Sequence, residues 1–274
     1  MANAKAKDIE VDLLLEGIQR LYGYDFRGYA RSSVIRRIEK HKMDIGLPTI
    51  SDLQARILHD QAAMDRFVDA MSVNVTSMFR DAEFFQAFRR FAIPELRKFP
   101  SLRLWVAGCS TGEEVYSLAI ILHEEGLLER ARIYATDFSE ANVEKAKTGR
   151  IPLKSMRDYT RNYFSCGGQK DFSSYYDTDL NYAELKKDLI RNISFSQHNL
   201  ITDKSFNEFQ VILCRNVMIY FERALQERAM HLLQRSLAPL GYLCLGSKES
   251  IVPASLNGRF DEMGSRTRLF RLKN

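Results

Sequence analysis

The 274-residue sequence has few of the features that mark membrane or secreted proteins. Its longest apolar stretches, such as Val217–Phe221, fall far short of the ~20 residues that span a bilayer. No apolar signal-peptide core follows Met1. We therefore expect a soluble, cytoplasmic protein that does not insert into the membrane.

Cysteine is scarce, with four residues that are widely scattered along the chain. They form no Cys-x-x-Cys pair, and no histidine lies nearby at metal-ligand spacing. This pattern predicts buried free thiols in a reducing compartment and no metal site. The sequence also lacks internal repeats and low-complexity tracts.

The net charge of +5 is modest but uneven, because residues 27–42 carry six Lys and Arg against one Glu. Helical spacing in this segment places Val34 and Ile38 on one side of a helix. It predicts Arg36, Arg37 and Lys40 on the other side. Nucleic acid, a membrane surface or an acidic protein are all compatible partners for such a basic face.

The first part of the chain predicts helices without strand signals. Residues 8–22 show helical periodicity that ends at Gly23, and further helices are predicted near residues 32, 51 and 61. We expect a helical N-terminal domain over residues 1–75. A helical linker is predicted over residues 76–99.

From residue 100 to residue 274 the pattern changes to short β-type runs that alternate with helices. Alternation of this kind predicts an α/β fold with a mostly parallel, doubly wound sheet that binds ligands at the carboxyl ends of its strands. Residues 150–192 interrupt the alternation and suggest an inserted subdomain. An antiparallel hairpin is predicted at residues 259–272. The expected strands are residues 102–107, 132–136, 193–197, 209–214 and 242–246.

The loop Val106–Ala119 places Gly108 and Gly112 between a strand and a helix, as in nucleotide-binding proteins. Glu113 and Glu114 follow directly, and they would repel a phosphate at the helix N-terminus. An adenosine that carries positive charge, as in S-adenosylmethionine, fits better. Alternatively, the two glutamates only favour the first helical turn.

Other polar residues follow the strands at the same predicted edge. Asp137 ends the second strand, where a carboxylate can accept hydrogen bonds from both ribose hydroxyls. Arg215 and Asn216 follow the fourth strand, and His198-Asn-Leu200 follows the third. Each alone is compatible with a simple turn or strand-end cap. Together they predict one ligand site.

Four motifs in this order resemble the CheR family of chemotaxis receptor methyltransferases, and the resemblance covers nearly the whole chain. They are Asn74-Val-Thr-Ser-Met-Phe-Arg80, Ser110-Thr-Gly-Glu-Glu114, Ala135-Thr-Asp137 and Cys214-Arg-Asn-Val-Met-Ile-Tyr-Phe221. The resemblance implies methyl transfer from S-adenosylmethionine to glutamates on the cytoplasmic helices of chemoreceptors during adaptation. The product would be S-adenosylhomocysteine.

The resemblance also implies roles for individual residues. Arg80 and Tyr220 would face the reacting carboxylate, and the basic residues Arg36, Arg37 and Lys40 would meet the acidic receptor helices. A monomer is expected. The implied cofactor contacts are Asn74, Thr76, Arg80, Glu114, Asp137, Asn199, Leu200, Arg215 and Asn216.

The implied chemistry needs no general base, because a glutamate with a pKa near ~4.3 is already ionised at neutral pH.

Two alternatives remain open. One is a regulatory protein that binds S-adenosylmethionine without catalysis, and the other is a nucleic-acid methyltransferase. The second usually carries Asn/Asp-Pro-Pro-aromatic after the fourth strand, where this chain has Arg215-Asn-Val-Met. Residues 150–192 are longer and richer in tyrosine than the family pattern, so docking of a receptor tail there is left open.

Overall fold

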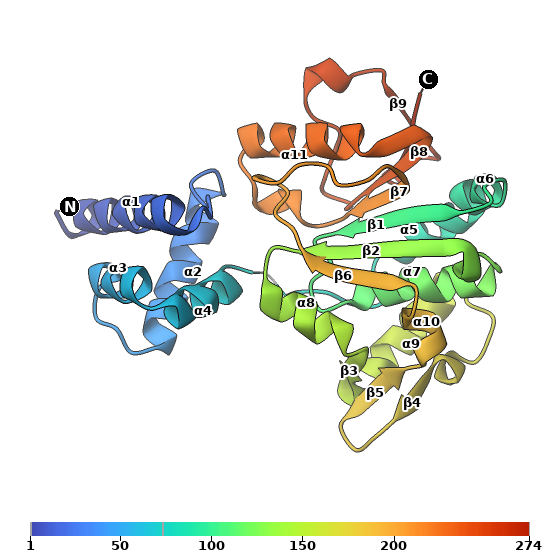
Figure 1. Ribbon diagram of the computed structural model, residues 1–274, viewed down its shortest axis with the longest axis horizontal. Coiled ribbons are helices and arrows are strands. Elements are labelled where there is room, and N and C mark those ends of the chain that lie inside the picture. The colour runs from blue at the N-terminus through green and yellow to red at the C-terminus, as the bar shows by residue number, and fades with distance from the viewer. Residues whose placement is uncertain (1, 73, 274) are drawn as a thin grey trace. The chain divides into compact units, whose positions relative to one another are not determined.

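The computed structural model describes residues 2–72 and 74–273. The chain divides into two compact units (Figure 1). One contains the residues up to 72 together with Tyr220–Arg228, and the other contains Asn74–Ile219 and the residues from Ala229 onward. No helix among the described residues is both long enough and apolar enough to cross a membrane.

The first unit is built from helices, as the periodicity predicts. The sequence supplies clear start signals, because the Thr49 side chain accepts from the backbone of Asp52 in a capping box and Asp60 caps the next helix. Leu14, Ile38 and Phe67 are fully buried in its core. The four helices are α1 (Ala2–Tyr22), α2 (Arg31–Asp44), α3 (Ile50–His59) and α4 (Gln61–Met71).

The prediction that Arg37 lies on the exposed side of α2 is wrong. Arg37 is 9% exposed, and it shares the buried side of the helix with Val34 and Ile38. Its Nη1 donates to the Met71 carbonyl at 2.5 Å, and its guanidinium lies 4.9 Å from the Tyr220 ring centroid. A cation can be buried here because a carbonyl and an aromatic face receive it. Arg36 and Lys40 are exposed, as predicted.

The segment Tyr220–Arg228 completes the first unit. The Ala30 N–H donates to the Tyr220 carbonyl at 2.9 Å, and the Glu222 N–H donates to the Gly28 carbonyl at 2.8 Å. A Cβ on Gly28 would lie 2.6 Å from Leu225 Cγ, so a larger residue would push this segment away. The loop between α1 and α2 therefore fixes the backbone from the Tyr220 carbonyl to Glu222.

The second unit contains the seven-stranded sheet, in the order β6-β2-β1-β7-β8-β10-β9. The first five are parallel, and β10 and β9 add antiparallel at one edge. Both the predicted strand positions and the terminal hairpin are confirmed. The strands are β1 (Leu102–Ala107), β2 (Ala131–Asp137), β6 (Ile193–Gln197), β7 (Phe209–Cys214), β8 (Leu237–Leu245), β9 (Phe260–Glu262) and β10 (Leu269–Leu272).

Helices cover both faces of this sheet, which confirms the doubly wound α/β fold (Figure 1). In the view of Figure 1, α7 (Glu113–Glu124) and α8 (Glu140–Lys147) lie on one side, and α11 (Arg223–Arg235) lies on the other. Nine of the twelve residues of α7 are buried, so this helix forms the centre of the core. Its amino end is thereby fixed at the carboxyl edge of the sheet.

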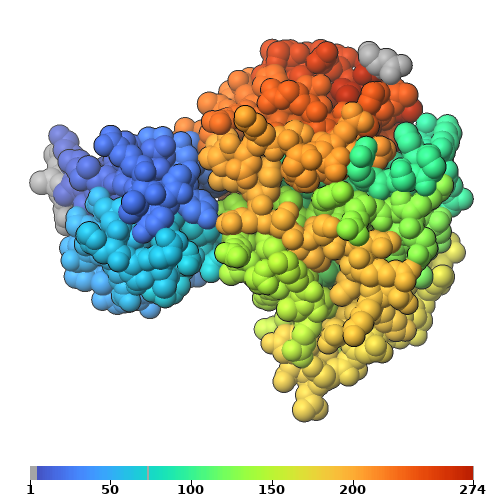
Figure 2. Space-filling model, viewed as in Figure 1, coloured from blue at the N-terminus to red at the C-terminus, as the bar shows by residue number. Residues whose placement is uncertain are grey.

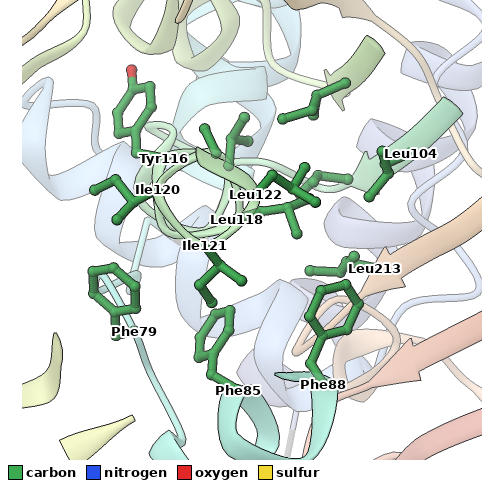
Figure 3. Packing of buried hydrophobic residues seen from close by; sticks show 14 of the residues in the cluster. Phe79, Phe85, Phe88, Leu104, Tyr116, Leu118, Ile120, Ile121, Leu122 and Leu213 are labelled. Carbon is green, nitrogen blue, oxygen red and sulfur yellow. The ribbon is translucent and has the colours of Figure 1, made fainter. Parts of the chain in front are cut away.

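The predicted helical linker of residues 76–99 is instead part of the second unit. Helix starts only at α5 (Ala82–Ala87) and continues through a π-turn (η1, Phe88–Ala92) into α6 (Ile93–Leu96). Phe79, Phe85 and Phe88 are buried and lie along one side of α7 (Figure 3). Burial of these rings stabilises the segment against the sheet domain, which local periodicity did not reveal.

The insertion between α8 and β6 forms a small subdomain with an antiparallel sheet in the order β3-β5-β4. It is the yellow lobe in Figure 2. Tyr163 and Tyr175 donate hydrogen bonds to Glu124 at the end of α7, and Arg89 pairs with the same carboxylate. Its elements are β3 (Arg150–Pro152), α9 (Met156–Ser165), β4 (Tyr176–Thr178), β5 (Tyr182–Leu185) and α10 (Lys187–Ile190).

Replacing Arg37 by alanine should lower the free energy of unfolding by about 1–3 kcal/mol, because the buried Met71 carbonyl loses its partner. Arg36→Ala, on the exposed side of α2, should change it by less than about 0.5 kcal/mol. Urea denaturation of the full chain measures both. Equal effects of the two variants would contradict the assignment of Arg37 to the core.

Candidate functional site

The loop after β1 is shaped by its two glycines. Gly108 has φ +80° and Gly112 has φ +100°, a region that residues with a side chain rarely adopt. A Cβ on Gly108 would lie 2.4 Å from Val217 Cγ2, and one on Gly112 would lie 2.6 Å from the Tyr116 ring. Close packing inside the protein thus requires both glycines, whether or not a ligand approaches them.

Asp137, at the end of β2, organises the neighbouring loops. Its Oδ2 accepts from the Ser110 N–H at 2.8 Å, and its Oδ1 accepts from the Ser139 N–H at 3.1 Å. The Asn142 side chain donates to Asp137 Oδ1 at 3.3 Å and to Asn74 Oδ1 at 2.9 Å. The structure therefore brings Asn74 and Asp137, which were predicted separately, into one hydrogen-bonded network.

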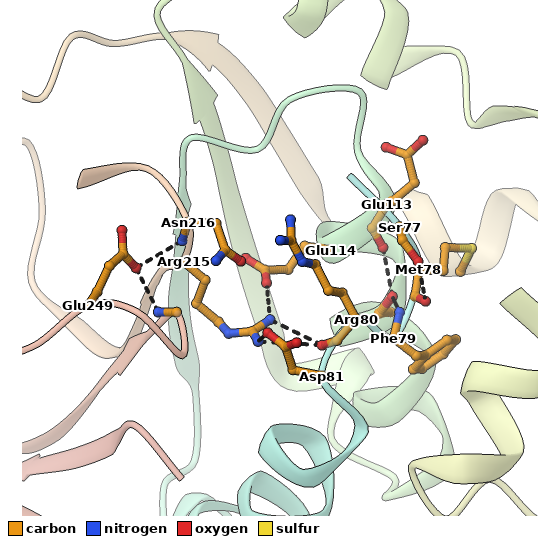
Figure 4. A network of polar contacts seen from close by, with 12 residues as sticks. Ser77, Met78, Phe79, Arg80, Asp81, Glu113, Glu114, Arg215, Asn216 and Glu249 are labelled. Atoms are coloured by element: carbon orange, nitrogen blue, oxygen red, sulfur yellow. Dashed lines mark hydrogen bonds and ion pairs between the residues drawn. The ribbon is translucent and has the colours of Figure 1, made fainter. Parts of the chain in front are cut away.

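Arg215, at the end of β7, lies between two carboxylates (Figure 4). Its guanidinium nitrogens are 2.6 Å from Glu114 and 2.7 Å from Asp81, and the group lies 4.1 Å from the Phe84 ring centroid. The side chain is 1% exposed. Arg215 therefore holds Glu114 in place. Because its side chain is buried, little of its guanidinium is accessible to a ligand.

Arg80 is held by an unusual backbone on both sides. Phe79 has φ +54° and Asp81 has φ +61°, although neither is glycine. The Phe79 N–H donates to Ser117 Oγ of α7 at 2.9 Å, and Arg80 Nη1 donates to the Val75 carbonyl at 3.1 Å. Strained backbone of this kind concentrates at functional sites.

The same conformation recurs at Ser110 (φ +49°) and Asn216 (φ +61°). Four of the seven non-glycine residues with positive φ in the described chain therefore lie in the loops predicted to hold the cofactor. This clustering marks the carboxyl edge of β1, β2 and β7 as the candidate site.

The site is rich in carboxylates that are withdrawn from water. Burial raises the pKa of Glu114, although Arg215 opposes this effect. Burial also raises the pKa of Glu113, against a hydrogen bond from Thr111, and that of Asp137, against its backbone hydrogen bonds. A raised carboxyl pKa means that the negative charge is incompletely compensated by the protein.

These residues fit S-adenosylmethionine. Glu114 and Asp137 are acceptors for an ammonium group and for hydroxyls, and Asn74 and Asn216 add amide groups beside them. Among the described residues of this edge, Arg215 is the one buried arginine, and it is already paired with two carboxylates. The donor set therefore suits a cationic adenosine better than a phosphorylated one.

The remaining predicted residues are less closely tied to this network. The Asn199 side chain accepts from the Ile201 N–H at 2.9 Å, which is a local turn, and Leu200 is 7% exposed. Thr76 is half-buried. Tyr220 belongs to the helical unit and is described there. For all four residues the predicted ligand contacts stay predictions.

Two residues of this edge escaped prediction. Asp81 directly follows the recognised Arg80 motif, and Glu249 is buried shortly after β8. Only the position of Glu249 after a strand could have indicated a role at this edge, because the carboxyl ends of the parallel strands β7 and β8 lie side by side. An acid after one strand can then reach the loop after its neighbour.

Sequence comparison identifies relatives over the whole described chain. Residues 74–269 match the family described as "CheR methyltransferase, SAM binding domain", and residues 9–72 match "CheR methyltransferase, all-alpha domain". Cher3 of Pseudomonas putida is 44% identical over 99% of both chains. The chemotaxis protein methyltransferase Cher2 of the same species is 31% identical and covers 80% of this chain and 82% of its own.

Other matches have lower identity. The chemotaxis protein methyltransferase of Listeria monocytogenes is 28% identical, over 89% of this chain and 92% of its own. Among solved structures, the SAM-bound amino pentose methyltransferase CalS10 of Micromonospora echinaspora is 15% identical, with a TM-score of 0.37 over 63% of this chain and 52% of its own.

Replacing Glu114 by glutamine should weaken binding of S-adenosylmethionine about 10- to 100-fold, because a buried charged acceptor is lost. The matched variant Glu113→Gln should change the affinity by less than about twofold. Isothermal titration calorimetry measures both. Equal losses in the two variants would remove Glu114 from the ligand site.

The pH dependence of this binding follows from the same group. Because burial raises the pKa of Glu114, this carboxyl takes up its proton at a higher pH than an ordinary glutamate. The affinity of the parent protein should therefore fall as the pH is lowered through that raised pKa, and fall less in Glu114→Gln.

Proposed function

We propose, from the premise that the chain belongs to the CheR family of S-adenosylmethionine-dependent chemotaxis methyltransferases, that it methylates glutamates of chemoreceptors. The acceptor would be the side-chain carboxylate of glutamates on the cytoplasmic receptor helices. The products would be glutamate methyl esters and S-adenosylhomocysteine.

The observation that supports a carboxylate acceptor is the contrast between two arginines of the second unit. Arg215 is buried and paired with Asp81 and Glu114. Arg80 forms no ion pair with the described residues of its unit, and its guanidinium has only the Val75 carbonyl as a hydrogen-bond acceptor there. An unpaired guanidinium offers the planar donor geometry that orients a carboxylate.

For this reaction, the protein mainly has to align the two reactants and exclude water from the site. An ionised glutamate is already a nucleophile at neutral pH. S-adenosylmethionine supplies an electrophilic methyl group, and no proton has to be removed from the acceptor. A dry site helps, because opposite charges neutralise each other during the reaction. Arg80 should orient the acceptor without holding it so tightly that the ground state is stabilised.

Residues of the second unit would divide the work of holding the cofactor. Glu114 would accept hydrogen bonds from the ammonium group of the cofactor. Asp137 and Asn74 would form hydrogen bonds with its ribose. Asn216 would line the site after β7. Arg215 would act through Glu114, since their 2.6 Å ion pair fixes that carboxylate.

The helical unit would recognise the acidic receptor helices. Arg36 and Lys40 are exposed on α2 and carry no ion pair in the described structure. Arg37, buried against Tyr220, would support that ring rather than contact the receptor. Tyr220 remains the second proposed group at the acceptor carboxylate.

The direct test is incubation with tritiated S-adenosylmethionine and membranes that carry candidate receptors. The label should become receptor-bound and be released by base, because carboxyl esters hydrolyse whereas N-methyl groups do not. Arg80→Gln should lower kcat/KM for the receptor about 100-fold. Arg132→Gln, at the exposed amino end of β2, is the matched control.

Base-stable label on the receptor, or label on DNA or RNA instead, would refute the proposed acceptor. An Arg80→Gln protein that methylates receptor as fast as the control would remove the assigned role of Arg80.

Reversing the charges of Arg36 and Lys40 together, by Arg36→Glu and Lys40→Glu, should raise the KM for receptor at low ionic strength. The effect should shrink as salt is added, because the Debye length falls to about 10 Å at 0.1 M. Initial rates at several receptor and salt concentrations measure this. An unchanged KM at low salt would show that this face of α2 does not meet the receptor.

A further inference from the structure

Glu249 is a buried carboxylate that none of the recognised motifs contains. It follows β8 and is 5% exposed. It forms no ion pair with the described residues of its unit. A carboxylate withdrawn from water without a cation is costly unless hydrogen bonds replace its hydration.

Four backbone N–H groups supply those bonds. Glu249 Oε2 accepts from Asn216 at 2.8 Å and from Gly246 at 2.7 Å. Glu249 Oε1 accepts from Val217 at 3.0 Å and from Met218 at 2.8 Å. Figure 4 shows the carboxylate of Glu249 beside Asn216, on the far side of Arg215 from Arg80.

The backbone around Asn216 is shaped for this anion. Asn216 has φ +61°, and the N–H groups of three consecutive residues converge on the two oxygens of one carboxylate. Such a concave set of amides is an anion-binding nest, and here a side chain of the same protein fills it. The nest needs Glu249, because three converging donors without an acceptor would be left unsatisfied.

Gly246 brings the carboxylate close enough. A Cβ at this position would lie 2.7 Å from both the backbone N and the side-chain Nδ2 of Asn216, and 2.8 Å from Glu249 Oε2. Only glycine leaves this space free. The end of β8 and the loop after β7 are therefore fitted together around the Asn216 side chain.

We propose that Glu249 is a positioning residue for methyl transfer, which acts through the backbone of residues 216–218 to hold Asn216 at the cofactor site. It also places a fixed negative charge beside that site, where the cofactor is a cation. The inference rests on the proposed role of Asn216 in holding the cofactor. It adds a residue that touches neither cofactor nor acceptor.

The charge of Glu249 reaches its surroundings. Burial is the largest cause of the raised pKa of Glu114, and Arg215 opposes it. The negative charge of Glu249 adds to the effect of burial. It also adds to the effect of burial in raising the pKa of the Cys214 thiol. Glu114 and Cys214 both lie near the loops proposed to hold the cofactor. Removal of the Glu249 charge should therefore change the electrostatic potential at the cofactor site.

The test is Glu249→Gln, which removes the charge and puts an amide NH₂ group opposite N–H donors. We expect the Kd for S-adenosylhomocysteine, measured by calorimetry, to rise about 10- to 100-fold. The KM for S-adenosylmethionine should rise at least as much, because it carries the sulfonium charge that the product lacks, while kcat at saturating cofactor should change by less than about threefold. Loss of folded protein alone would lower kcat and leave KM unchanged.

Glu124→Gln is the matched control. Glu124 is a half-buried carboxylate of the same unit that also accepts from several donors, although it is paired with Arg89, and it lies at the opposite end of α7 from Glu114. Its replacement should lower the melting temperature but leave the Kd within about twofold. If Glu249→Gln does not fold, Glu249→Asp, which keeps the charge but is shorter, should still raise the Kd.

An unchanged Kd in a folded Glu249 variant, or an equal rise in Glu124→Gln, would overturn the proposal. Product binding requires no acceptor, so this test stands even if the acceptor proves not to be glutamate. Conversely, a failed Glu249 test leaves the base-labile methyl assay unaffected.

Discussion

The structure of the candidate site depends on the burial of one cation. The guanidinium of Arg215 is 1% exposed and touches Glu114, Asp81 and the ring of Phe84. These groups come from the end of β7, the start of α7, and α5 together with the residue before it. A buried charge that loses a partner costs several kcal/mol. The three segments must therefore be assembled together, and Arg80 is placed by the same event because it precedes Asp81 directly.

Pairing one arginine with two carboxylates also decides the charge of the site. Four carboxylates of this edge, Asp81, Glu114, Asp137 and Glu249, stand against two arginines, the buried Arg215 and the partly exposed Arg80. The excess is acidic, which explains how a glycine-containing loop can be followed by glutamates. The loop resembles a phosphate-binding loop in its backbone, but its surroundings favour a ligand of positive charge.

The strands and the fold class could be predicted because their signals are local. β1, β6 and β7 begin and end where apolar runs meet turn residues, so their bounds were predicted correctly. Arg37 was misplaced because its charge decided the assignment, whereas helical spacing puts it three residues after Val34 on the buried side of α2. What buries it is the Met71 carbonyl and the Tyr220 ring, which are remote in sequence.

In the site, too, residues with a local sequence signal could be predicted and residues placed by remote contacts could not. Motif residues such as Glu114, Asp137 and Asn216 were found because each follows a strand or opens a helix. Glu249 was missed because its partners are backbone N–H groups, which have no signature in the sequence of the partner segment. The segment before α5 was taken for helix because φ values such as +54° at Phe79 depend on the fit to Ser117 of α7.

In the proposed reaction, the protein aligns an ionised carboxylate with a cationic cofactor and moves no proton. The most direct test is the single-turnover rate of methyl transfer, with cofactor and receptor fragment both saturating, between about pH 7 and about pH 9. We expect a flat profile, because the acceptor carboxylate is ionised throughout this range. A rate that rises about tenfold per pH unit would contradict it, since a general base would then be required.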